Sequence, residues 1–66
     1  MAKPALKQRD WVRLPSGRIA TIRKITGENR PDATLRYLDD NGVMSTGEFE
    51  VKFEFLQKFA VKVGSS

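Results

Sequence analysis

Five residues near the start of the chain have side chains that can bind a nucleic acid. They are one indole and four cations: Trp11, Arg13, Arg18, Arg23 and Lys24. Lysine and arginine neutralise phosphates and release their counterions, and an aromatic ring stacks on a base for about 1–3 kcal/mol. These side-chain types predict a surface that binds RNA or single-stranded nucleic acid.

The charge of the chain is concentrated in the same region. Its 66 residues carry a formal net charge of +4. Residues 1–30 hold eight Lys or Arg against two acids, whereas residues 31–66 hold four against six. A basic half suggests contacts with phosphates. The alternative is a solvated basic surface that serves solubility only.

A β-hairpin is expected to position these side chains. Residues 15–17, Pro-Ser-Gly, suit a three-residue loop, with proline at its favoured place in a type I turn and glycine closing a bulge. The loop sets four cross-strand pairs: Leu14 with Arg18, Arg13 with Ile19, Val12 with Ala20, and Trp11 with Thr21. Paired residues share a face of the sheet, so the register decides which side chains reach solvent.

The hairpin therefore has an apolar face and a mixed face. The core face holds Val12, Ala20 and Ile22. The outer face holds Trp11, Arg13, Ile19, Thr21 and Arg23, with Arg18 and Lys24 at its edges. A bulge near Arg23 and Lys24 is needed to keep Ile25 inside. The alternative for Trp11 is that it covers an open end of the fold or an oligomer contact.

A second hairpin is expected after the polar loop at residues 26–32. A three-residue loop at 40–42 is preferred to a two-residue Asn-Gly turn, because only the longer loop gathers the apolar residues on one face. That face holds Ala33, Leu35, Tyr37 and Phe49, with Leu35 opposite Gly47. Leu38 and Met44 are then paired outside, near the tip. Such a pair is a candidate contact for a protein partner or a second copy, or it shields its own hairpin.

The last third of the chain alternates apolar and charged residues from Phe49 to Phe55, which predicts a strand. Apolar residues also recur at steps of three and four, as in a helix. Because aromatic and β-branched residues dominate, the strand is favoured. A break near residues 56–58 would precede a last strand from Phe59 to Val63.

The expected fold is thus all-β with five short strands, and its order resembles the SH3-like small barrels, which include KOW and Tudor domains. The resemblance is carried by residues 10–14 (DWVRL), 17–22 (GRIATI) and 37–42. Arg9 and Ala20 depart from it, since the family often has glycine at both places. The resemblance implies a five-stranded barrel over residues 10–63 that binds RNA, DNA or protein. Residues 1–9 are expected to form a flexible basic arm, and residues 64–66 a disordered tail.

Several functions are not expected. The chain has no cysteine and no histidine, so it lacks thiolate chemistry and the commonest metal ligand and acid–base group. The acids near residue 40 are explained by turn chemistry, and one tyrosine is too few for an aromatic cage. We expect no catalytic residue, metal or cofactor. No apolar run suits a membrane span or a secretory signal, so a cytoplasmic protein is expected.

Overall fold

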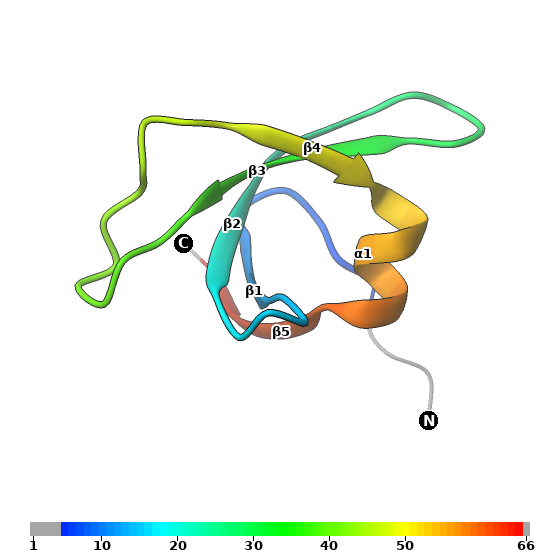
Figure 1. Cartoon of the computed structure of the whole chain (residues 1–66). Coiled ribbons are helices and arrows are strands. Elements are labelled where there is room, and N and C mark those ends of the chain that lie inside the picture. The colour runs from blue at the N-terminus through cyan, green and yellow to red at the C-terminus, as the bar shows by residue number, and fades with distance from the viewer. Residues whose placement is uncertain (1–4, 66) are drawn as a thin grey trace.

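Residues 5–65, which the computed structural model describes, form one five-stranded antiparallel sheet and one short helix (Figure 1). The elements are β1 Asp10–Arg13, β2 Ile19–Thr26, β3 Asp32–Tyr37, β4 Phe49–Lys52, α1 Phe53–Phe59 and β5 Val61–Ser65. The strand order is β4-β3-β2-β1-β5. The expected five-stranded, mostly β fold is confirmed. No pairing between β4 and β5 closes the sheet within these residues, and α1 connects its two edges.

The first hairpin has the predicted loop and register. Trp11 lies opposite Thr21, and Val12 lies opposite Ala20. Leu14 N–H donates to the Arg18 carbonyl at 2.9 Å, and Gly17 N–H donates to the Leu14 carbonyl at 2.8 Å. Gly17 has a φ of +91°, a conformation that glycine adopts without steric cost. The turn residues therefore fix which side chains of β1 and β2 face the core.

The buried side chains of the core are aliphatic, and Tyr37, Phe49 and Phe53 pack partly buried against them. The buried members are Leu6, Val12, Ala20, Ile22, Ala33, Leu35, Leu56 and Ala60. They include the predicted core face of the first hairpin. The register of β2 and β3 shifts between Ile22 and Lys24, which confirms the predicted bulge, and Ile25 packs partly buried against the core.

The second hairpin keeps the predicted tip but not the predicted strand register. Leu38 lies opposite Met44 as expected, and Asp39 N–H donates to the Val43 carbonyl at 3.0 Å. Leu35, however, lies opposite Phe49 rather than Gly47. A shift of two residues keeps every side chain on its predicted face. The shifted register also places Phe49 diagonally next to Tyr37, where the two rings stack with centroids 4.6 Å apart.

The predicted strand through Phe55 is wrong after Lys52, where β4 ends and α1 begins. The helical turn buries Leu56, which is 1% exposed, against the core. It leaves Phe55 and Phe59 about half exposed. The last strand consequently starts at Val61 instead of Phe59.

Both ends of the described chain are more ordered than predicted. Leu6 is buried, and its N–H donates to Gln57 Oε1 at 2.8 Å. The packed domain therefore begins at Leu6, inside the predicted arm of residues 1–9, of which residues 1–4 lie outside the described residues. Of the predicted tail, Gly64 and Ser65 belong to β5, and residue 66 is not described.

The turn before β1 holds Arg9 in a left-handed conformation, with φ at +76°. A side chain makes this conformation unfavourable by about 1 kcal/mol or more. We therefore expect Arg9→Gly to raise the free energy of unfolding by about 0.5–1 kcal/mol in urea denaturation. Arg9→Ala removes the same charge and keeps the strain, so it should give no such gain. An equal gain in both variants would show that charge, and not backbone strain, is responsible.

Candidate nucleic-acid interface

Four of the five predicted residues lie on the outer face of the sheet. Thr21 is paired with Trp11 on one side and with Arg36 on the other, and Lys24 is paired with Thr34. Because residues alternate between faces, Trp11, Arg13 and Lys24 point away from the core. Arg23 lies at the bulge and is exposed, as are Arg13 and Lys24.

The three predicted cations of this face, Arg13, Arg23 and Lys24, have no carboxylate partner within residues 5–65. Four ion pairs occur within residues 5–65: Arg30–Glu54, Arg36–Glu48, Lys52–Asp32 and Lys62–Asp10. None of them includes Arg13, Arg23 or Lys24. Arg23 Nη1 lies 3.6 Å from the Met44 sulfur, a contact that leaves its charge uncompensated. Positive charge therefore remains on the outer side of β1 and β2.

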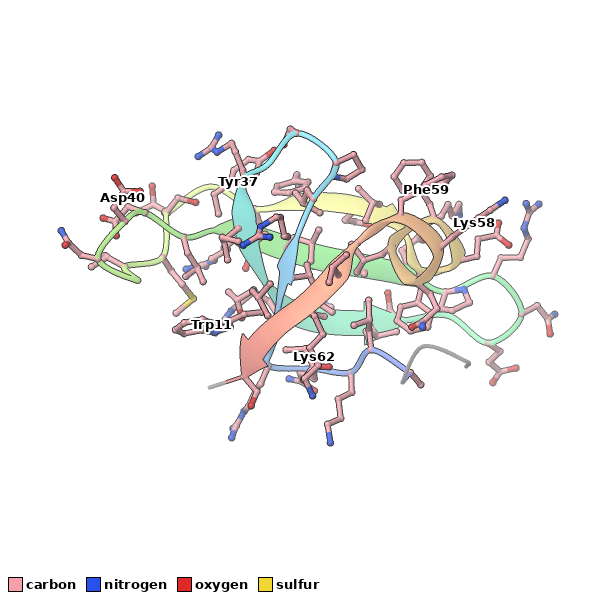
Figure 2. The ribbon with its side chains drawn as sticks, turned by 90° about the horizontal axis from the view of Figure 1, so that it is seen from below. Trp11, Tyr37, Asp40, Lys58, Phe59 and Lys62 are labelled. Carbon is pink, nitrogen blue, oxygen red and sulfur yellow. The ribbon has the colours of Figure 1, made fainter. Side chains whose placement is uncertain are left out.

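Trp11 is only partly exposed. Gly64 and Gly42 both lie close to the indole. A Cβ atom added to Gly64 would be 3.5 Å from Trp11 Cε3, and a Cβ atom added to Gly42 would be 3.9 Å from Trp11 Cη2. The indole therefore lies between β5 and the tip of the second hairpin. In Figure 2, Trp11 lies on the same side of the molecule as Asp40, away from Lys58 and Phe59. Only the uncovered part of the ring can contact a ligand.

Arg18 does not belong to this face. Its guanidinium carbon lies 3.6 Å from the centre of the Tyr37 ring, in a cation–π contact. Tyr37 lies opposite Ala20 on β2, and Arg18 precedes Ala20 by two residues. Residues two apart in an extended chain point to the same face, so Arg18 lies on the face of Ala20. The predicted register already implied this position.

Thr21 is also placed differently from the prediction, since it is 3% exposed although it lies on the outer face. Its two cross-strand neighbours, Trp11 and Arg36, carry long side chains that shield it. The burial of a small residue between two large ones depends on three adjacent strands. The register of the first hairpin alone therefore does not predict that Thr21 is buried.

The prediction that Leu38 and Met44 are exposed together is wrong for Leu38 and right for Met44. Leu38 is only 8% exposed, because its N–H donates to the Ile19 carbonyl at 2.9 Å and holds it under the first hairpin. Met44 is exposed as predicted. Its exposed apolar neighbour is Val43 rather than Leu38.

Acidic residues border the cations on the β4 side. A hollow in the surface is lined by Arg23 and Lys24 on β2, Thr34 on β3, and Glu48, Phe49 and Glu50 around the start of β4. Glu48 accepts a hydrogen bond from Arg36 Nε at 2.9 Å, so it also neutralises the one cation on β3. The uncompensated positive charge is therefore concentrated on β1 and β2 rather than on β3 or β4.

Within residues 5–65, no group of three or more Asp or Glu side chains is placed to hold a metal ion. None of the described helical residues forms a segment long and apolar enough to cross a membrane. Comparisons of the chain with protein families, with curated proteins and with solved structures gave no match.

Proposed function

We propose that this chain is a non-catalytic binding module that holds RNA or single-stranded nucleic acid on the outer face of β1 and β2. The observation that carries the proposal is the set of three exposed cations without carboxylate partners, Arg13, Arg23 and Lys24, on one face. The resemblance to SH3-like small barrels agrees with a binding role. In this proposal the protein acts in the cytoplasm, where such ligands are found.

The three cations bind phosphates, and the uncovered part of Trp11 contacts a base or sugar beside them. The carboxylate of Glu50 repels the backbone of the ligand and keeps it along β1 and β2, whereas Glu48 is neutralised by Arg36. Reading a duplex through its major groove requires a helix or a two-stranded ribbon that fits into the groove. Helix α1 has seven residues and lies away from Trp11 in Figure 2, and β1 and β2 are each paired with a further strand and do not form a free two-stranded ribbon. Sequence-specific duplex binding is therefore not part of this function.

Replacing both Arg13 and Arg23 with alanine is expected to weaken the binding of all sequences alike. Each phosphate contact on a single strand contributes about −0.7 to the slope of log affinity against log salt. Loss of two contacts should therefore make the slope shallower by about 1.4. The measurement is fluorescence anisotropy of labelled RNA and DNA oligomers at several salt concentrations.

The matched control is the double variant Arg30→Ala and Lys52→Ala. It removes the same net charge, but both cations are ion-paired, with Glu54 and Asp32. Its affinity and salt slope should stay close to those of the unmodified chain. Equal binding by the two double variants would refute a localised interface.

A further inference from the structure

Four exposed apolar side chains lie along α1 and β5. They are Phe55, 48% exposed, Phe59, 48% exposed, Val61, 54% exposed, and Val63, 42% exposed. We refer to these four residues as the apolar stripe. Phe55 and Phe59 lie on α1, away from the nucleic-acid interface proposed above, whereas Val61 is paired with Arg13 and shares its face of the sheet.

The backbone makes the stripe continuous. Phe55 and Phe59 are four residues apart on α1, so they lie on the same side of the helix, and their ring centroids are 4.7 Å apart. Ala60 is extended, with ψ at 151°, and β5 continues in extended form. Phe59 and Val61 are therefore two residues apart, and Val63 lies at the irregularity where the register of β5 with β1 skips one residue between Lys62 and Gly64. In Figure 2, Phe59 lies at the end of α1 from which β5 runs.

We propose that a second copy of this chain covers the apolar stripe, giving a twofold-symmetric dimer. None of the six aromatic residues is fully buried: Tyr37, Phe49 and Phe53 pack partly buried against a core whose buried side chains are aliphatic, three of them alanine. A 66-residue chain without cysteine has a small core and no disulfide to stabilise it. Covering the phenylalanines adds the apolar burial that the isolated chain lacks.

The size of the stripe matches what a small dimer needs. Four half-exposed side chains of these types present roughly 350 Å² of apolar surface, or about 700 Å² for two copies. Apolar atoms make up about 60% of a typical interface. The complete interface would then bury about 1,200 Å², which is the lower end of the range for specific association.

The charges beside the stripe favour a copy of the same chain over a strongly charged partner. The exposed side of α1 carries Glu54 and Lys58 together with the two phenylalanines. Glu54 is ion-paired with Arg30, so the charges beside the stripe are nearly balanced, which suits a copy of the same chain better than a strongly charged partner. Lys58 also lies 5.5 Å from the centre of the Phe59 ring.

The test measures the mass of the protein in solution by sedimentation equilibrium, without nucleic acid. At high protein concentration the chain should approach twice its mass of 7.5 kDa. The double variant Phe55→Ser and Phe59→Ser should raise the dissociation constant at least tenfold. Neither substituted residue belongs to the nucleic-acid interface, so the two proposals are tested separately.

The control is Val43→Ser, because Val43 is 60% exposed and lies outside the stripe. It should dimerise like the unmodified chain. A monomer at every concentration, or a dimer that survives the double substitution, would overturn the proposal. If the double variant does not fold, NMR of the unmodified chain decides. Concentration-dependent shifts should map to the stripe, and shifts elsewhere or none at all count against it.

Discussion

Replacement of Asp10 with alanine should lower the free energy of unfolding by about 3 kcal/mol. Asp10 is fully buried, and its Oδ2 accepts a hydrogen bond from the Lys7 N–H at 3.0 Å. Its Oδ1 lies 3.5 Å from Lys62 Nζ and has no hydrogen-bond partner among the described residues. Alanine leaves the Lys7 amide and the Lys62 ammonium without their partner. It thereby loosens the contact of β5 with the start of β1.

Urea denaturation followed by Trp11 fluorescence measures this effect. The control is Asp32→Ala, because the pair between Asp32 and Lys52 has a similar distance of 3.0 Å but is exposed to solvent. An exposed pair contributes about 0.5 kcal/mol or less. Asp10→Asn keeps an oxygen for the Lys7 amide and should fall between the two. If Asp10→Ala lowered the free energy of unfolding no more than Asp32→Ala, the buried contact of Asp10 would contribute no more to stability than the exposed pair.

The second large effect is expected at Leu56, the one buried residue of α1. Leu56→Ala should cost about 3 kcal/mol, because it removes apolar contacts and leaves a cavity in a closely packed core. A domain of this length has a total stability of only about 3–10 kcal/mol. The variant should therefore unfold at a clearly lower temperature, as measured by circular dichroism.

The adjacent residue Phe55 provides the comparison. Its side chain is larger, yet it is 48% exposed, so Phe55→Ala should cost about 1 kcal/mol or less in the monomer. Both variants are compared at low protein concentration, which keeps any association out of the measurement. A larger loss at Phe55 than at Leu56 would mean that α1 packs through its other side.

The first hairpin could be predicted from the sequence because its turn is specified locally. The Pro-Ser-Gly loop fixes the register, and the register fixes the faces, as the pairing of Val12 with Ala20 confirms. The second hairpin was predictable at its tip for the same reason. Its register farther along was not predictable, because it depends on the stacking of Phe49 with Tyr37 and not on the turn.

The helix escaped prediction because its sequence lacks capping residues, although Glu54 in its first turn and Lys58 in its last turn have the charges that favour a helix. Lys52 precedes α1 and provides no side-chain cap, and Ala60 rather than glycine follows it. The exposed phenylalanines also contribute to an alternation of apolar and charged residues that is typical of a strand. Leu56 and Ala60 are both buried and four residues apart, which is a helical spacing. The alternation of apolar and charged residues was the stronger pattern and favoured a strand.

The candidate site was partly predictable. The outward position of Arg13 follows from the hairpin register alone. The lack of carboxylate partners does not, because ion pairs join residues far apart in the chain, such as Arg30 and Glu54. Arg18 is exposed but lies over the Tyr37 ring, on the side of the sheet that its two-residue separation from Ala20 indicates.

The pairing of β1 with β5 has a consequence for synthesis on the ribosome. Strands β2, β3 and β4 each pair with a strand next to them in the chain, so they can assemble while translation continues. Strand β1 lacks its second neighbour until residues 61–65 have been made. Contacts over such long separations slow folding. One side of β1 therefore stays unpaired until residues 61–65 are available to pair with it.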